Sequence, residues 1–263
     1  MCTPAGEPDS TVQKRVPNKA LDEAADREVC EWKNFPPRPG QRGRYRGEQH
    51  MSPFETASAT HAYRERCEDH VAIFSNDSRT VVAVADGAGG GGAGDVAART
   101  ALHEIESAYS NVHSASDWVS ILRQIDCRIC EGETTVVVVD IRPFGIAGAS
   151  VGDSRAAIVC ESTTSELTIN QNRKPLLGSG FAEPVAFMSS PLVGVLLVGT
   201  DGFFNYAKPD AIQKLIATTE FSALPRRCIE LVRLPSGDHW DDVGIVAVRN
   251  RKRSVTRRRF IVD

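Results

Sequence analysis

The chain reads Val81-Val82-Ala83-Val84-Ala85-Asp86-Gly87-Ala88-Gly89-Gly90-Gly91-Gly92 at the point that decides its fold. The apolar run has the length of a strand, and the glycines after it predict a loop, so a buried strand ends at Asp86. Over 95–107 the apolar residues recur at helical spacing, which predicts a helix directly after the loop. A carboxylate therefore stands between a strand and a glycine-rich turn.

The loop from Gly87 to Gly92 also matches the GxGxxG pattern of dinucleotide-binding proteins. Asp86 would repel a pyrophosphate there, and a second helix follows the first where a βαβ unit has its second strand. No acidic residue then ends a second strand to bind a ribose. We therefore favour a site in which the Asp86 carboxylate and the Gly87 carbonyl face a cation.

Strands and helices alternate in blocks around this segment. The patterns predict strands over 54–61, 70–75, 79–86, 134–140, 145–151, 155–160, 166–169, 193–200 and 243–249, and helices over 95–107, 114–129, 209–218 and 221–234. Ser116 is expected to cap the second helix. Consecutive helices between blocks of strands favour an α+β layered sandwich, with helices on the outside of antiparallel sheets.

Length and composition describe one globular domain with extensions. The 263 residues include 31 basic and 34 acidic ones, with a net charge of −3, which excludes a globally basic nucleic-acid binder and a fully disordered acidic chain. We expect a largely flexible, proline-rich extension over 1–53 that includes a short helix over 19–32. A single folded domain is expected over 54–250, followed by a basic tail over 251–263.

The cellular compartment and the redox state of the cysteines can also be predicted from the sequence. Its apolar runs are strand-sized, and its first residues have neither a basic nor an apolar signal region, so we expect a cytoplasmic protein. The seven cysteines are scattered and odd in number, which favours reduced thiols. Cys127 and Cys130 form a CxxC pair, but no second pair or histidine at suitable spacing supports a zinc site.

Acidic residues recur at the edges of the predicted strands. They are Glu68, Asp69, Asp86, Asp153, Asp201, Asp241 and Asp242. If they converge in the fold, like charges oppose folding unless cations lie among them. An all-oxygen set without paired histidine or cysteine suits Mg²⁺ or Mn²⁺ better than Zn²⁺.

Five motifs in this order resemble those of the type 2C metal-dependent serine/threonine protein phosphatases, in a compact, bacterial-type form. They are RERCED at 64–69, VADGAGG at 84–90, VGDSR at 151–155, LVGTDG at 197–202 and DDV at 241–243. The resemblance covers about residues 55–249. It implies two antiparallel β-sheets sandwiched between pairs of α-helices, which agrees with the order of elements above.

The resemblance also implies a centre of two Mg²⁺ or Mn²⁺ ions and a weaker third ion. Asp86 would bridge the two ions, and Arg64 would bind the substrate phosphate. The metal ligands implied are Glu68, Asp86, the carbonyl of Gly87, Asp201 and Asp241, with Asp153 at the weaker third site.

The activity implied is hydrolysis of phosphoserine and phosphothreonine by a metal-bridged hydroxide that attacks in line. Partners would be phosphoproteins and a serine/threonine kinase or its targets, in signalling by a cytoplasmic monomer that binds neither nucleic acid nor membrane. The alternative is a catalytically weak or inactive phosphatase-like module that binds or regulates a phosphoprotein or kinase. The presence of Glu68, Asp86, Asp201 and Asp241 favours the enzyme.

Three departures from the family pattern bear on the chemistry. Ala88 stands where many relatives have a histidine that protonates the leaving group. Asn205 stands where many have another acid for the third ion, which predicts weak binding there. The segment 174–180 replaces a longer region that carries a flap in relatives, so a large flap is not expected to select the substrate.

Neighbours of the motifs are expected to have structural roles. Arg66 shares a face with Arg64, and spacing favours Arg64 as the phosphate ligand. Asp69 is expected to form hydrogen bonds at a strand edge, Asp242 to support its neighbour, and Thr134-Thr135 to pack beneath the site.

Overall fold

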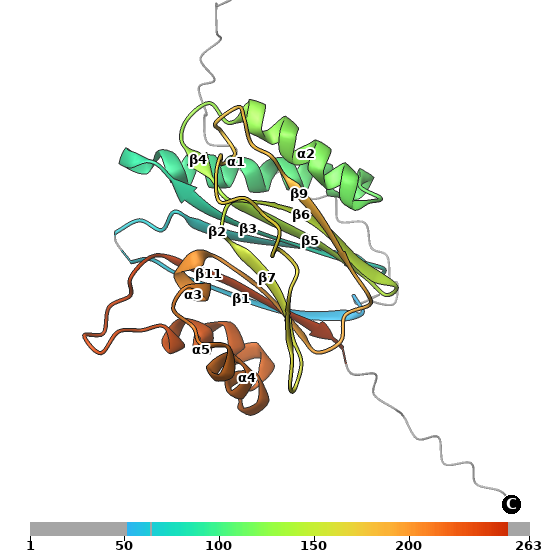
Figure 1. The fold of residues 1–263 in the computed structure, drawn as a ribbon, viewed down its shortest axis with the longest axis vertical. Coiled ribbons are helices and arrows are strands. Elements are labelled where there is room, and N and C mark those ends of the chain that lie inside the picture. Colours follow the sequence, from blue (N-terminus) through green and yellow to red (C-terminus); the bar gives the residue numbers. More distant parts are fainter. Residues whose placement is uncertain (1–51, 64, 252–263) are drawn as a thin grey trace, which may run out of the picture. The chain divides into compact units, whose positions relative to one another are not determined.

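Two antiparallel β-sheets lie face to face at the centre of the fold (Figure 1). The computed structural model describes residues 52–63 and 65–251. One sheet has the strand order β1-β11-β10-β7-β8, and the other has the order β2-β3-β5-β6-β9, with β4 paired to β3. The strands are β1 (Phe54–His61), β2 (Asp69–Ser75), β3 (Thr80–Ala88), β4 (Glu133–Thr134), β5 (Val136–Arg142), β6 (Gly145–Val151), β7 (Arg155–Val159), β8 (Thr164–Glu166), β9 (Val185–Ser189), β10 (Val195–Gly199) and β11 (Val243–Asn250).

Helices cover the outer face of each sheet. The sheet that contains β5 packs against α1 and α2, and the sheet that contains β11 packs against α4 and α5 (Figure 1). The helices are α1 (Ala93–Ala108), α2 (Ala115–Arg128), α3 (Asp201–Phe204), α4 (Pro209–Thr218) and α5 (Leu224–Leu231), with single turns η1 (Gly90–Gly92), η2 (Tyr109–Asn111) and η3 (Phe221–Ala223). The α+β sandwich expected from the sequence is therefore confirmed.

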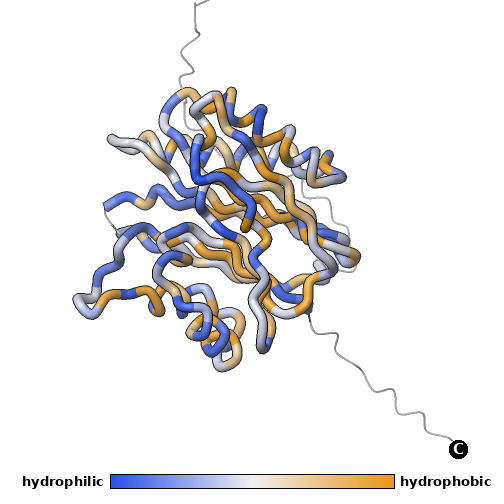
Figure 2. The backbone as a smooth tube through the Cα atoms, in the orientation of Figure 1, coloured by the Kyte–Doolittle hydropathy of each residue, from blue (hydrophilic) through white to orange (hydrophobic). Residues whose placement is uncertain are grey.

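The run Val136–Val139 of β5 explains how the layers hold together. Val136 and Val138 pack in the cluster beneath α1 and α2, whereas Val137 and Val139 pack between the two sheets. A strand that is buried on both faces requires apolar residues at every position, so its sequence shows no alternation. Figure 2 shows this hydrophobic interior along the central strands.

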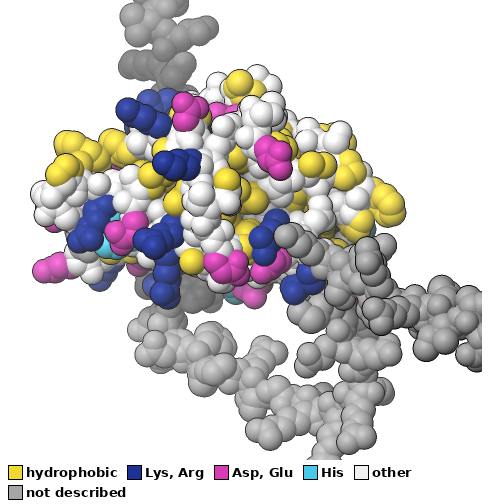
Figure 3. Space-filling model, turned by 90° about the horizontal axis from the view of Figure 1, so that it is seen from below, with side chains coloured by type: hydrophobic (Ala, Val, Ile, Leu, Met, Phe, Trp, Pro, Cys, Tyr) yellow, Lys and Arg dark blue, Asp and Glu magenta, His cyan; other side chains and the backbone are white. Residues whose placement is uncertain are grey.

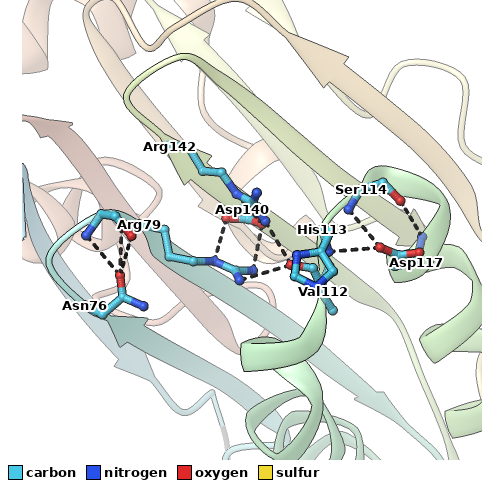
Figure 4. A network of polar contacts seen from close by, with 9 residues as sticks. Asn76, Arg79, Val112, His113, Ser114, Asp117, Asp140 and Arg142 are labelled. Carbon is cyan, nitrogen blue, oxygen red and sulfur yellow. Dashed lines mark hydrogen bonds and ion pairs between the residues drawn. The ribbon is translucent and has the colours of Figure 1, made fainter.

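A buried ion-pair network connects the turn before β3, the strand β5 and the connection before α2 (Figure 4). Arg79 donates to both carboxylate oxygens of Asp140, from Nε at 3.1 Å and from Nη2 at 2.7 Å. Arg142 donates to the same carboxylate at 2.8 Å, and both arginines also donate to the carbonyl of Val112. The network therefore pairs the buried Asp140 carboxylate with cationic partners, so its charge is not left without compensation in the core.

The start of α2 corrects one expectation. The hydroxyl of Ser114 accepts a hydrogen bond from the Asp117 N–H at 3.2 Å, and the Asp117 carboxylate accepts one from the Ser114 N–H at 2.9 Å. This reciprocal pair is a capping box, so Ser114 is the N-cap. The prediction that Ser116 caps the helix was wrong because Ser116 already lies inside it.

Other differences concern short elements. No strand was predicted over 185–189, where β9 lies; only Phe187 of its five residues is buried, so burial imposes no alternating pattern on its sequence. The strand predicted over 166–169 lies instead at β8, and α3 was not predicted. Residues 221–234 form η3 and the shorter α5.

The surface of the described residues mixes both signs of charge. On the face in Figure 3, Lys and Arg side chains lie among Asp and Glu side chains. None of the helices in this part of the chain has the length and hydropathy that crossing a bilayer requires. The expected N-terminal extension, its helix over 19–32 and the tail from residue 252 lie outside the described residues.

Candidate metal centre

Asp86 lies near the end of β3, opposite Asp69 in the pairing with β2. Two threonines fix its backbone: its N–H donates to Oγ1 of Thr135 at 3.1 Å, and its carbonyl accepts from Oγ1 of Thr134 and the Thr135 N–H, each at 2.9 Å. Thr135 also shares a buried hydrogen bond of 2.7 Å with Ser154. Thr134 and Thr135 are buried against Asp86, as expected for residues beneath this position, and the same contacts connect the end of β3 with the Asp153 loop.

Two glycines bring Glu68 and the start of α1 against Gly87. The Gly87 N–H donates to the Glu68 carbonyl at 3.1 Å. A Cβ atom on Gly87 would overlap with the Gly94 backbone, and one on Gly94 would lie 2.7 Å from Oε2 of Glu68. Only glycine allows this approach, so the glycine-rich loop positions the Glu68 carboxylate next to the end of β3.

The start of α3, which carries Asp201, is also in contact with the loop that carries Asp241. A Cβ atom on Gly202 would overlap with the Asp242 carbonyl and lie 3.4 Å from Cβ of Asp241. Next to this contact, Oγ1 of Thr200 accepts a hydrogen bond from the Gly244 N–H at 2.9 Å. The end of β10 and the start of β11 therefore present their acids from neighbouring positions.

Asp242 joins these loops to the other sheet. Its carboxylate accepts hydrogen bonds from the Tyr63 N–H at 2.7 Å and from the Glu68 N–H at 2.6 Å. A Cβ atom on Gly244 would lie 3.4 Å from Cβ of Asp69, which places β2 directly over β11. Asp242 thus supports the loop that contains Glu68, and acids from both sheets meet at one end of the sandwich.

The pKa values of these acids reflect their proximity. Burial, followed by the charges of Asp69, Asp201, Asp241 and Asp153, raises the pKa of Asp86 to about 9. Burial also raises the pKa of Asp69 to about 7, and burial with the charge of Asp153 raises the pKa of Asp201. These acids come from five separate segments and repel one another, so their charged forms require compensation by cations.

The donor set fits hard divalent cations. Oδ2 of Asp69 is buried and accepts no hydrogen bond from any described residue. No three His, Cys, Asp or Glu side chains of the described ranges converge closely enough to hold an ion by themselves. Mg²⁺ and ions like it prefer oxygen ligands and keep several waters, so the chemistry of this all-oxygen donor set suits them.

Asp153 has a cationic partner in Arg173. Arg173 donates to its Oδ2 from Nε at 3.0 Å and from Nη2 at 2.6 Å. Arg155 donates to Oδ1 of Asn205 at 3.0 Å, and Nδ2 of Asn205 donates to Asp201 at 3.0 Å. Sequence reasoning missed Arg173, because it belongs to none of the motifs.

The predicted phosphate ligand Arg64 lies outside the described residues. Arg66 is described, and its guanidinium lies against Gly92, where a Cβ atom would overlap with it. Arg66 therefore contacts the loop that follows Asp86. Ala88 pairs with Glu133 at the end of β3.

The segment 174–180 is held in place by two sets of contacts. Leu177 and Thr134 exchange backbone hydrogen bonds of 2.9 and 3.1 Å. The buried Asp126 carboxylate accepts three backbone N–H bonds, from Gly178 at 2.7 Å and from Gly180 and Ala182 at 3.0 Å each. This segment is a short, fixed loop next to the threonines that support Asp86.

No protein-family model matches the sequence, and no curated protein is similar to it. The fold is similar to that of a bacterial serine phosphatase that carries a point mutation (TM-score 0.69, 20% identity, 76% of this chain and 100% of that one). It is also similar to the S. agalactiae serine/threonine phosphatase (0.66, 19%, 75% and 100%). The catalytic domain of the serine/threonine phosphatase PstP, solved in complex with two manganese ions, is a third example (0.61, 18%, 74% and 97%). The type 2C-like fold expected from the motifs is confirmed.

Proposed function

We propose that this chain is a metal-dependent protein phosphatase that hydrolyses phosphoserine and phosphothreonine. One observation carries the proposal: acids from five separate segments meet at one end of a sandwich whose fold serine/threonine phosphatases share. A purely structural role would leave these carboxylates repelling one another without compensation. Bound divalent cations would offset this repulsion, which accounts for the grouping of the acids at this end of the sandwich.

The proposed ligands of two Mg²⁺ or Mn²⁺ ions follow the contacts described above. They are Glu68, Asp86, the Gly87 carbonyl, Asp201 and Asp241. Bound ions of this kind supply a water nucleophile of lowered pKa and polarise a phosphoryl oxygen. Asp153 is the ligand proposed for a weaker third ion, although Arg173 already pairs with it.

The remaining tasks fall to other residues of the chain. Arg64 is proposed to bind two phosphate oxygens, because a guanidinium matches them with two parallel hydrogen bonds. Ala88 has no proton to give, so the leaving alkoxide must receive its proton from water or another residue.

Substrates would be phosphoproteins of a cytoplasmic signalling system that includes a serine/threonine kinase, with the phosphatase acting as a monomer.

The test is hydrolysis of p-nitrophenyl phosphate and of a phosphoserine peptide by the full chain. We expect turnover with added Mn²⁺, its loss in EDTA, and its loss in Asp86→Asn, because that change removes a central ligand charge while keeping the shape of the side chain. Asp238→Asn is the matched control, since Asp238 is an exposed acid in the loop before Asp241.

Two results would contradict the proposal. Absence of metal-dependent turnover above the Asp86→Asn background would favour the alternative, a phosphatase-like module that binds or regulates a phosphoprotein or kinase. Equal activity of Asp86→Asn and the unmodified chain would remove Asp86 from the site.

A further inference from the structure

The first turn of α1 lies against two of the proposed metal ligands. A Cβ atom on Gly94 would lie 2.7 Å from Oε2 of Glu68 and 2.6 Å from the carbonyl carbon of Gly87. The Gly94 backbone therefore leaves no room for a side chain between itself and either group. A shift of this turn would change the position of the Glu68 carboxylate and of the Gly87 carbonyl together.

The loop that leads into this turn gives it little support. Gly91 and Gly92 have φ values of 72° and 88°, and Cβ atoms on Gly90 and Gly91 would meet no other atom within 4 Å. The N-cap of α1 is Gly92, which has no side chain to accept from the free N–H groups of the first turn. Contacts of the turn itself must therefore set its position.

Asp95 supplies a hydrogen bond from this turn to the sheet. Its Oδ1 lies 2.7 Å from Nε2 of His70 in β2, so the imidazole N–H donates to the carboxylate. The Asp95 side chain is only 13% exposed, whereas Arg99, which lies 3.6 Å from its other oxygen, is 68% exposed and contributes little. Because His70 is two residues from Glu68, the bond joins the start of α1 to the segment that carries this ligand.

We propose that Asp95 and His70 are positioning residues of the metal centre. Their hydrogen bond holds the first turn of α1 against β2, and the Gly94 backbone in this turn then fixes the Glu68 carboxylate and the Gly87 carbonyl. This inference rests on the proposed function and adds two residues to the site, neither of which is a proposed ligand. Groups that orient metal ligands lower the metal affinity when they are removed, although they bind no ion themselves.

Apolar packing holds the rest of α1 independently of this bond. The buried residues of the helix that pack on the sheet are Ala97, Ala98, Ala101, Leu102 and Ile105. Loss of the bond between Asp95 and His70 therefore leaves the helix in place and frees its first turn. The expected effect is on the affinity for ions and not only on the stability of the fold.

Isothermal titration calorimetry measures the Kd of Mn²⁺ for the full chain and its variants. Asp95→Ala and His70→Phe each remove the bond and should each raise the Kd by about tenfold. Asp95→Asn keeps an oxygen that accepts from His70, so its Kd should stay within about twofold of that of the unmodified chain. Combining Asp95→Ala with His70→Phe should raise the Kd no further, because both changes remove the same interaction.

Two controls separate the bond from the loss of charge. Glu106→Ala removes an exposed acid near the other end of α1, and Arg99→Ala removes the exposed partner of Asp95. Both variants should keep the Kd of the unmodified chain. The Tm in EDTA shows which variants are folded, and because Asp95→Ala and His70→Phe remove the bond from opposite sides, either folded variant decides the question.

The outcomes separate this inference from the proposed function. If the unmodified chain binds Mn²⁺ but hydrolyses no phosphopeptide, the proposed function fails, and the series of Kd values still tests the positioning residues. If the chain is active but Asp95→Ala and His70→Phe bind Mn²⁺ as tightly as it does, the inference is overturned and the function stands. A rise in Kd that Asp95→Asn shows in full, or that is larger in the double variant, would also overturn the inference. Absence of Mn²⁺ binding by the unmodified chain would contradict both.

Discussion

Arg173 places a positive charge next to the acids of the candidate metal centre through its two hydrogen bonds to Asp153. Its guanidinium opposes the rise in the pKa of Asp201, which burial and the charge of Asp153 cause. A third divalent ion at Asp153 would have to displace or share this partner. The residue that the sequence offers as a third-site ligand is thus already partly neutralised.

Replacing Arg173 with alanine is therefore expected to tighten Mn²⁺ binding. The gain should be no more than a few-fold, because Arg173 is exposed and exposed ion pairs are weak. Isothermal titration calorimetry measures the affinity directly, and Arg123→Ala removes an exposed arginine of α2 as a control for net charge. Mn²⁺ binding that is unchanged or weaker in Arg173→Ala would contradict this account.

Individual site residues differed in how far the sequence could predict them. Asp86, Asp201 and Asp241 could be predicted as ligands because each stands at the edge of a predicted strand within a motif. The pairing of Asp69 with Asp86 and the contact of Arg173 with Asp153 depend on how distant segments pack. No local pattern carries that information, so these contacts appeared only in the folded chain.

At the level of secondary-structure elements, a buried ion pair connects the turn before β3 with β5, on the face of the sheet that α1 and α2 cover. Asp140 is almost fully buried and accepts hydrogen bonds from two arginines, which also donate to the carbonyl of Val112, directly after η2 (Figure 4). Removing one partner of a buried pair leaves the remaining charges without compensation, which costs more than the pair contributes.

Asp140→Asn is expected to lower the free energy of unfolding by about 3 kcal/mol or more. Urea denaturation followed by circular dichroism measures the change. Asp77→Asn, in the exposed turn between β2 and β3, should change the same quantity by less than about 0.5 kcal/mol. Equal stability of the two variants would mean that the arginines find other partners.

Prediction of elements succeeded where burial imposes a strong pattern. The fully buried β5 and the amphipathic α1, α2 and α4 were found with boundaries close to those observed. The edge strand β9 was missed because a single buried side chain gives no period, and the cap of α2 was misplaced by two residues. The pairing and order of the strands within each sheet were not predicted, since they depend on contacts between distant segments.

At the scale of the whole molecule, the acidic end of the sandwich connects stability with ion binding. Acids of both sheets come together only when the two sheets are packed, so ions bound there favour the folded chain over the unfolded one. Ligands that bind only the native state stabilise it by about 2.7 kcal/mol at a concentration one hundred times the Kd.

Mn²⁺ or Mg²⁺ should therefore raise the Tm of the full chain, and EDTA should reverse the shift. Differential scanning calorimetry over a series of ion concentrations measures it, with KCl at matched ionic strength as the control. Asp86→Asn should show a clearly smaller shift. A Tm that responds equally to KCl would indicate general screening instead of a specific centre.

The three backbone hydrogen bonds that Asp126 accepts have a consequence for how the protein is controlled. They hold the loop around Gly178 and Gly180 against α2. In the proposed phosphatase this loop would therefore not open and close over substrate on each turnover. Discrimination between phosphoproteins would then depend on surfaces that are present before the substrate arrives, and activity would be set by the supply of ions and of phosphorylated substrates.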